Sequence, residues 1–518
     1  MASEHPSLIP FPSHYLAGSG SFDLTADCSY SVDAPGLEGD RAVQYLRGQL
    51  QDRYGLILVE QPGRAKIRFR ISADVAGLRS EAYRLDVSPE GVAIVAVDGA
   101  GLFYGVVTLL QMLHDVEGGD GLRSLPAASV VDAPRYEWRG MMLDVARYFF
   151  PVQFIKQFID LMAMYKMNVF HWHLTEDQGW RIEIRKYPKL TEVGAWRAET
   201  LVGHLRDEPQ TFDGVAHGGF YTQAQVREVV EYAASRCITV VPEIEMPGHC
   251  VAALAAYPEL SCSGQPLDVS TKWGIHSDVY CAGKEETFEF LEDVLEEIVG
   301  LFPSRFVHIG GDECPKVRWR GHGLDQRRMR AEGLSSEEEL QSYFIRRIEK
   351  SLMAENRRLI GWDEILEGGL APEATVMSWR GFEGGVAAAN AGHDVVMTPM
   401  AHCYFDYYQS NDRVAEPLAH GRVLSLDEVY GFEPTPPGIA EDMAHHVLGA
   451  QGNVWTEYMP SESRVEYMSF PRMSALAEVL WTPARNRGFA GFVKRLRAHL
   501  GRLDQLGVRY RFPDDPVP

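Results

Sequence analysis

Two adjacent carboxylates, Asp312 and Glu313, are the strongest candidate for a catalytic centre in this sequence. They follow a short apolar run, residues 305–309, and the glycines Gly310 and Gly311. Consecutive side chains of a regular strand point to opposite faces, so both carboxyls can act on one substrate only if the backbone leaves the strand there. The two glycines permit that departure. Because two neighbouring carboxyls cannot both ionise easily, we expect one of them to hold a proton near neutral pH, as acid-base catalysis requires.

The elements around this pair decide between catalysis and a solvated acidic turn. From residue 135 onward, short apolar runs alternate with helical patterns, which is typical of βα units around a parallel sheet. Eight such runs begin near Gly140, Asn168, Ile238, Phe306, Leu359, Thr375, Asp394 and Val447. They predict a (β/α)8 TIM barrel over residues 135–518, with long insertions. The alternative is an open doubly wound sheet, but no glycine-rich phosphate loop follows the first run.

The first 134 residues predict a small α+β accessory domain. Short strands are expected at residues 66–71, 82–87 and 92–97, and apolar residues at helical spacing indicate a helix over residues 101–113. The whole chain is therefore predicted as α/β, with the barrel preceded by this domain. Asp132 to Arg135 interrupts both periodicities and is the expected joint.

Active sites of such barrels lie at the carboxyl ends of the strands, and polar and aromatic residues gather there in this chain. Besides Asp312 and Glu313, the strand ends offer Asp144 and Arg147, with Arg139 preceding the same run; Glu176, Asp177 and Trp180; Glu243, Glu245 and His249; Trp362, Asp363 and Glu364; Trp379 and Arg380; Tyr404 and Asp406; Trp455 and Glu457. Tryptophan faces stack on sugar rings, while carboxylates and arginine bind hydroxyls. A saccharide ligand follows from this set.

A metal site is the main alternative. His171 and His173 lie on the same side of the second predicted strand, as in metal-dependent amidohydrolases, and His249, His308 or His402 could complete the ligand set. Against it, the pair is on the second strand rather than the first, and a barrel-interior histidine usually serves as a hydrogen-bonded core residue. We therefore expect no metal and no cofactor.

Composition restricts the partners. Fifty Lys and Arg against 72 Asp and Glu give a net charge of −22, which disfavours nucleic acid and anionic membranes. Residues 1–15 lack the pattern of a secretion signal, and no apolar run reaches the length of a membrane span, so we expect a cytoplasmic protein. Seven cysteines without a CxxC pair indicate free thiols, although Cys281 or Cys314 could pair locally.

The strand-end segments together resemble the hexosaminidases of glycoside hydrolase family 20. The resemblance covers most of the chain and rests on the order and number of its motifs. They are Trp138-Arg139-Gly140 with residues 143–147 (Leu-Asp-Val-Ala-Arg), residues 173–180 (His-Leu-Thr-Glu-Asp-Gln-Gly-Trp), residues 242–249 (Pro-Glu-Ile-Glu-Met-Pro-Gly-His), residues 308–313 (His-Ile-Gly-Gly-Asp-Glu), residues 361–364 (Gly-Trp-Asp-Glu), residues 378–381 (Ser-Trp-Arg-Gly) and residues 455–457 (Trp-Thr-Glu). Glu245 and Glu176 stand where aspartate is common in the family, but both keep the charge.

The resemblance implies retaining hydrolysis without an enzyme nucleophile, because the substrate's 2-acetamido oxygen attacks the anomeric carbon. Glu313 would be the general acid and base, Asp312 would orient the acetamido N–H, and Asp177 with His249 would form a polar relay behind Glu313. Tyr404 would donate to the acetamido carbonyl. The remaining implied roles are an aromatic wall around the acetyl methyl, formed by Trp362, Trp379 and Trp455, and hydroxyl binding by Arg139, Asp406 and Glu457.

The expected function is therefore that of an exo-acting β-N-acetylhexosaminidase that passes through an oxazolinium intermediate. Its partner would be an oligosaccharide or glycoconjugate with a terminal β-linked N-acetylglucosamine or N-acetylgalactosamine. Release of a disaccharide, as by a lacto-N-biosidase, is the alternative within this chemistry. A metal-dependent amidohydrolase and a catalytically silent sugar-binding protein are the alternatives outside it. The preferred epimer, the aglycone and the oligomeric state stay open at this stage.

Overall fold

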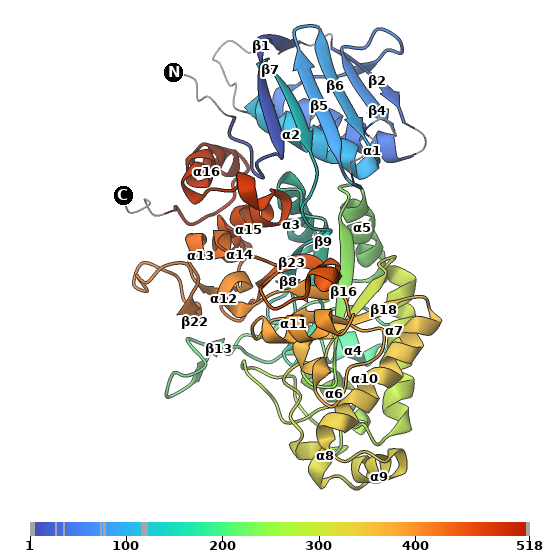
Figure 1. Ribbon diagram of the computed structural model, residues 1–518. Coiled ribbons are helices and arrows are strands. Elements are labelled where there is room, and N and C mark those ends of the chain that lie inside the picture. Colours follow the sequence, from blue (N-terminus) through green and yellow to red (C-terminus); the bar gives the residue numbers. More distant parts are fainter. Residues whose placement is uncertain are drawn as a thin grey trace.

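The computed structural model describes residues 6–25, 28–34, 37–72, 75, 79–114 and 123–513. Figure 1 shows a small α/β domain at one end of the molecule and a larger barrel below it. The chain passes from one to the other between Asp132, where β7 ends, and Trp138, where β8 begins.

The N-terminal domain is a twisted sheet covered on one face by two helices. The described strands pair in the order β1-β7-β5-β6-β4-β2-β3. Their bounds are β1 His14–Leu24, β2 Ser29–Asp33, β3 Val59–Glu60, β4 Ile67–Ile71, β5 Tyr83–Ser88, β6 Gly91–Ala96 and β7 Arg123–Asp132, and the helices are α1 Leu37–Tyr54 and α2 Gly99–His114. The three strands and the helix that the sequence predicts here correspond to β4, β5, β6 and α2.

The barrel is closed, which confirms the predicted fold and rules out the open doubly wound sheet. Its strands pair in the order β16-β17-β18-β19-β20-β23-β8-β9, and every neighbouring pair is parallel. The strands are β8 Trp138–Asp144, β9 Val169–His173, β16 Thr239–Met246, β17 Phe306–Gly310, β18 Arg358–Trp362, β19 Thr375–Ser378, β20 Val395–Met397 and β23 Val447–Val454. Each lies at one of the eight apolar runs, because a strand buried on both faces reads as a continuous apolar segment.

Helices surround the barrel and turn their apolar faces to it. In α3, for example, Phe154, Ile155, Phe158, Ile159 and Met162 recur at helical spacing and are buried. The helices after the strands are α3 Val152–Met164, α5 Gln223–Ala234, α6 Val251–Ala256, α7 Glu285–Leu301, α8 Val317–Gly321, α9 Gly323–Glu332, α10 Glu337–Ala354, α11 Glu383–Asn390, α12 Met400–Cys403, α13 Leu426–Tyr430, α14 Glu462–Ser469, α15 Arg472–Trp481 and α16 Phe489–Gln505.

Buried polar contacts join the two parts. The Lys166 ammonium, after α3, donates to the Asp132 carboxylate at 3.1 Å and to the Tyr83 hydroxyl at 2.9 Å, and the Trp481 indole donates to the same carboxylate at 2.8 Å. Arg502 of α16 donates to the carbonyl of Gln111 in α2 at 2.6 Å. The sheet domain is thereby held against the amino-terminal end of the barrel, opposite the end where the strand-end carboxylates lie.

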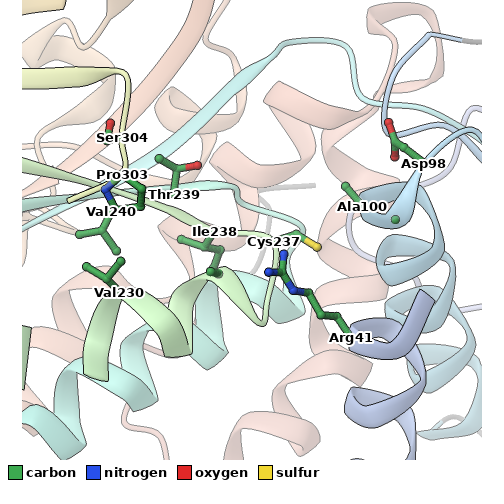
Figure 2. Close-up of a pocket in the computed structure, with 12 residues that line it drawn as sticks. Arg41, Asp98, Ala100, Val230, Cys237, Ile238, Thr239, Val240, Pro303 and Ser304 are labelled. Carbon is green, nitrogen blue, oxygen red and sulfur yellow. The ribbon is translucent and has the colours of Figure 1, made fainter. Parts of the chain in front are cut away.

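A cavity of about 500 Å³ lies at this junction, between α1, the start of α2 and the beginning of β16. Figure 2 shows Arg41, Asp98 and Cys237 around it together with apolar side chains such as Ile238 and Val240. Asp98 is already engaged, because its carboxylate accepts from the Gly101 amide at 2.8 Å and from Ser80 and the Glu81 amide. Among the described residues that line this cavity, no two carboxyls lie together as Asp312 and Glu313 do.

In the part of the chain that the structure describes, no helix combines the length and the apolar composition needed to cross a bilayer.

Candidate active site

The backbone leaves β17 where the two glycines stand. The strand ends at Gly310, and Gly310 and Gly311 have φ of 68° and 92°, in the left-handed region that glycine adopts without strain. Glu313 also has a positive φ, 43°. This turn takes Asp312 and Glu313 out of the strand's alternation, so that both carboxyls face one cavity.

That cavity holds about 390 Å³, within the range of ~300–1,000 Å³ typical of small-molecule sites. It opens at the carboxyl ends of the barrel strands. Eight of the residues that the sequence predicted for the site line it: His249, Asp312, Glu313, Trp379, Tyr404, Asp406, Trp455 and Glu457. They come from five strand ends, after β16, β17, β19, β20 and β23, so only the closed barrel brings them together.

His249 connects Asp177 with the carboxylate pair. Its Nδ1 lies 3.2 Å from Asp177 Oδ2 and 3.1 Å from Glu176 Oε1, and its Nε2 lies 3.5 Å from Glu313 Oε2 and 3.8 Å from Asp312 Oδ2. Asp177 is buried and does not line the cavity, and the Val251 amide donates to its second oxygen at 3.0 Å. Through His249, this arrangement can transfer a proton between the buried acidic groups and Glu313.

The environments of the two carboxyls separate their pKa values. Burial raises the pKa of Asp312 well above its usual range, and the nearby charges of Glu364 and Glu313 raise it further. Burial also acts to raise the pKa of Glu313, but the hydrogen bond and the charge of His249 outweigh it and lower this pKa. Glu176, Asp177 and Asp312 overcome the burial of His249 and hold its pKa well above the usual value, which favours its cationic form. The surroundings therefore favour the neutral form of Asp312 over the neutral form of Glu313.

Aromatic side chains form one wall of the cavity. Trp379 and Tyr404 are stacked, with ring centroids 5.9 Å apart and planes 21° from parallel. Trp455 hydrogen-bonds the Tyr404 hydroxyl, and burial raises the pKa of Tyr404 well above its usual value, so it stays a hydrogen-bond donor. Trp362 does not line the cavity but packs against Trp455, with the ring centroids 5.7 Å apart. Its indole donates to Glu243 at 2.9 Å.

Arg147, Asp406 and Glu457 form a second set of polar side chains in the same cavity. Burial, followed by the charge of Glu457, raises the pKa of Asp406 well above its usual range. Burial likewise raises the pKa of Glu457, although Arg147 opposes this. The Arg147 guanidinium contacts Glu176 at 2.6 Å and Glu457 at 3.9 Å and lies 5.0 Å from the Trp455 ring. One arginine and two carboxyls suit the recognition of several hydroxyls.

Arg139 is not part of this site, which contradicts the expectation that it binds a substrate hydroxyl. It is the second residue of β8, at the amino-terminal end of the barrel, and its side chain is fully buried. Its guanidinium pairs with Glu81 of the N-terminal domain at 2.7 Å and donates to Tyr104 at 3.0 Å and to two carbonyls. The length of β8 separates Arg139 from the carboxyl end of the strand. Arg147, which follows that end, lines the cavity instead.

Three of the histidines named for the metal alternative lie together inside the barrel, where the ligand atoms of His171, His308 and Glu243 come within 4.8 Å of one another. His171, His173 and His308 converge on the Glu243 carboxylate inside the barrel, with His171 Nε2 at 2.9 Å and His308 Nδ1 at 2.7 Å from it. His402 belongs to another contact set, because its ring stacks on Phe432 and its Nδ1 contacts the Glu428 carbonyl. Burial lowers the pKa of His171 to about 4. The three interior histidines act as a buried hydrogen-bonded group below the cavity.

Loop residues that no motif indicated complete the lining. They are His204, Leu205, Arg206, Trp273, Gly274, Ile275, Met400, Tyr407, His420, Arg422 and Tyr458. Arg147 was visible as a strand-end residue in the Leu-Asp-Val-Ala-Arg segment, but the sequence did not show which arginine would face the ligand. The loop residues carry no comparable signal, because their positions depend on how long insertions fold back over the barrel.

Two family models match nearly all of the chain. The model of the glycosyl hydrolase family 20 catalytic domain matches residues 136–484, and that of glycosyl hydrolase family 20 domain 2 matches residues 5–133.

Similar proteins share both parts. A β-hexosaminidase of Porphyromonas gingivalis is 46% identical over 98% of the chain, which spans 64% of that relative's length. An exo-β-N-acetylglucosaminidase of the same family from Vibrio harveyi, solved with N-acetylglucosamine, superposes with a TM-score of 0.88 and 35% identity, covering 98% of this chain and 79% of the other. An N-acetyl-β-hexosaminidase from Streptomyces plicatus superposes with a TM-score of 0.85 and 32% identity, covering 98% and 96%.

Proposed function

The chain belongs to glycosyl hydrolase family 20, and from this premise we propose that it is an exo-acting, retaining β-N-acetylhexosaminidase. Its substrate is an oligosaccharide or glycoconjugate that ends in β-linked N-acetylglucosamine or N-acetylgalactosamine. The observation that carries the proposal is the pair Asp312 and Glu313 in one cavity with the stacked Trp379 and Tyr404. The solved Vibrio harveyi relative, which contains N-acetylglucosamine, supports the class of sugar.

In the first step the substrate's acetamido oxygen attacks the anomeric carbon. The bond from that carbon to the leaving oxygen breaks, and Glu313 gives its proton to the leaving oxygen. A five-membered oxazolinium ring results, with positive charge shared over the former acetamide. Asp312, as a carboxylate, accepts the ring N–H and stabilises this charge, while the Tyr404 hydroxyl donates to the acetamido oxygen and fixes its line of approach.

In the second step water attacks the anomeric carbon from the side that the leaving group vacated. Glu313 takes one proton from the water. The bond between the anomeric carbon and the oxazolinium oxygen breaks, and the acetamide forms again. Two displacements at the same carbon give net retention of configuration. Glu313 ends protonated, ready for the next cycle.

Substrate binding must favour a neutral Glu313, which donates the proton, and an ionised Asp312. The protein's own groups raise the pKa of Asp312 and lower the pKa of Glu313, the latter because His249 stabilises the charge on Glu313. The acetamido N–H is a donor that favours an ionised Asp312, and a sugar over Glu313, whose side chain is 35% exposed, removes water from it and favours its neutral form. Both effects move the single proton from Asp312 to Glu313.

The wall of aromatic rings suits the apolar methyl and the flat face of an N-acetylated sugar. Trp379, Tyr404 and Trp455 line this wall, and Trp362 supports it from below. Arg147, Asp406 and Glu457 take the hydroxyls of the terminal sugar. Because these three groups would bind the hydroxyls of the terminal sugar, we expect them to exclude a further sugar beyond it, which is the basis for exo action.

The test compares hydrolysis of aryl β-N-acetylglucosaminide, aryl β-N-acetylgalactosaminide and aryl β-glucoside. The acetamides should be cleaved with retention, seen by NMR of the first-formed anomer, while the glucoside should resist. Equal cleavage of the glucoside, or inversion, would refute assistance by the acetamide.

Two further substrates address the alternatives. An aryl β-lacto-N-bioside cleaved faster than the monosaccharide glycosides would show a disaccharide-releasing enzyme instead. Tight binding of N-acetylglucosamine without turnover of any glycoside would show a silent sugar-binding protein.

A further inference from the structure

Four side chains with metal-binding donor atoms meet away from the cavity: Cys262, Cys281, His322 and Asp325. Their ligand atoms all lie within 4.8 Å of one another. Asp325 is at the centre, with its carboxylate oxygens 3.3 Å from the Cys262 sulfur and 3.4 Å from the Cys281 sulfur, and 2.7 Å from His322 Nδ1. The Cys281 sulfur lies 3.4 Å from the same His322 nitrogen.

These separations match the edges of a tetrahedral zinc site. With Zn–S of ~2.3 Å and Zn–N or Zn–O of ~2.0–2.1 Å, the ligand atoms of such a site lie roughly 3.3–3.8 Å apart. The distances from the two sulfurs to the Asp325 oxygens, and from the Cys281 sulfur to His322 Nδ1, fall in that range. The hydrogen bond between His322 and Asp325 is shorter, at 2.7 Å, so these two groups would separate by roughly 0.6 Å around an ion.

The charges in the cluster also favour a cation. The Asp325 carboxylate is fully buried and faces two thiols and the imidazole of His322, whose side chain is 24% exposed. The Gly283 amide donates to this carboxylate at 2.5 Å. Two sulfurs, one imidazole and one carboxylate form a donor set that favours zinc over the harder magnesium and calcium ions.

The backbone brings these residues together from two distant segments. Cys262 and Cys281 stand at the two ends of the loop over residues 263–280, where the Cys281 amide donates to the Leu260 carbonyl at 2.9 Å. His322 and Asp325 lie at the start of α9. The segments touch closely at Gly283, where a Cβ atom would lie only 2.3 Å from the Leu324 backbone.

We propose that Cys262, Cys281, His322 and Asp325 bind a structural zinc ion. The ion ties the 263–280 loop to the segment that follows the catalytic strand end of β17. None of the four ligands lines the cavity, so the site stands apart from the proposed hydrolysis and does not depend on it.

The loop held by the ion contributes to the cavity and to the relay. Trp273, Gly274 and Ile275 line the cavity. The Ser270 amide donates to the carbonyl of Asp177 at 3.0 Å, and Gln178 donates to the Lys272 carbonyl at 2.9 Å. The zinc site therefore positions one wall of the cavity and the peptide behind His249.

The experiment measures metal in the full-length protein, purified under reducing conditions and dialysed against metal-free buffer. Elemental analysis should find one equivalent of zinc, lost in Cys262→Ser and in His322→Ala. Cobalt added to the apo protein should give a thiolate-to-cobalt charge-transfer band that Cys262→Ser abolishes. Zinc removal should lower the midpoint of thermal unfolding, and zinc added back should restore it.

The matched control is Cys237→Ser, which removes a half-buried thiol outside the cluster and should keep the full equivalent. His322→Ala covers the case in which a cysteine variant does not fold, because His322 is partly exposed. Full zinc content in His322→Ala would overturn the proposal by placing the ion elsewhere. So would a metal-free protein in which mass analysis finds Cys262 and Cys281 joined as a disulfide under the same reducing conditions.

Discussion

Nε2 of His249 lies 3.5 Å from Oε2 of Glu313, close enough for its hydrogen bond and charge to lower the pKa of that carboxyl. The other ring nitrogen lies between the carboxylates of Asp177 and Glu176. His249 therefore sets the protonation of the residue that must donate the proton, and the dependence of activity on pH should reveal it.

The first prediction concerns the alkaline limit of kcat/KM. In the native protein the last proton of the carboxylate pair leaves with the raised pKa of Asp312, and activity is lost as pH rises through it. In Asp312→Asn only Glu313 titrates, with its lowered pKa, so the decline should begin at lower pH. The measurement is kcat/KM for an aryl β-N-acetylglucosaminide across the pH range.

His249→Asn should shift the same limit in the opposite direction. Loss of the imidazolium removes the charge that lowers the pKa of both carboxyls, so activity should persist to higher pH. Asparagine suits the position because His249 has φ of 48°, which asparagine tolerates. Shifts in the same direction for both variants would contradict the assignment of one shared proton.

The second prediction concerns Tyr404. Tyr404→Phe keeps the ring stacked on Trp379 but removes the donor to the acetamido oxygen. Loss of one such donor costs about 10²–10³ in kcat, and KM should change far less. Tyr407→Phe is the matched control, since it lines the same cavity without an assigned role. A similar loss of kcat in both variants would show a general disturbance of the wall.

The third prediction separates two arginines. Arg139→Met should destabilise the protein by about 3 kcal/mol, because it breaks a buried ion pair with Glu81 between the two domains. Its KM should stay close to that of the native protein. Arg147→Met should instead raise KM, since Arg147 lines the cavity beside Glu457. Thermal unfolding and steady-state kinetics on both variants check this, and a raised KM for Arg139→Met would return Arg139 to the site.

The fourth prediction concerns the turn that carries the carboxylates. A Cβ atom at Gly310 would lie 1.6 Å from Glu245 Oε2, and φ there is 68°. Gly310→Ala should cost at least the roughly 1–3 kcal/mol of a strained backbone and displace Asp312 and Glu313, so stability and kcat should fall together. Gly300 lies in the exposed last turn of α7, and a Cβ atom added there would meet no neighbouring group within 4 Å. Gly300→Ala should therefore leave the stability of the protein unchanged or raise it by about 0.4–1 kcal/mol. Equal effects at the two glycines would refute the argument.

The eight barrel strands could be predicted because burial on both faces leaves a local pattern. Each strand is a short apolar run, and the helices between them show their own period. The turn after β17 was also predictable, since a pair of glycines before two carboxylates marks a place where the backbone can leave the strand. These features depend on residues that are neighbours in the chain.

The two arginines show where such reasoning fails. Arg139 is the second residue of β8 and Arg147 follows the end of the same strand. Both belong to motifs of the family, so the residue types did not distinguish them. Strict use of the rule that barrel sites lie at the carboxyl ends of strands would have favoured Arg147. Only the packed structure shows that Arg139 faces Tyr104 and Glu81, because those partners come from another domain.

The sequence alone determined the fold, the family and the carboxylate pair, because each depends on residues that lie close together along the chain. The tertiary structure decided which arginine faces the cavity, which loops complete it and that Cys262, Cys281, His322 and Asp325 meet. The spacing of those four residues matches no short metal motif. Their donor atoms come within reach of one another only when the 263–280 loop packs against α9, and that contact depends on long-range packing.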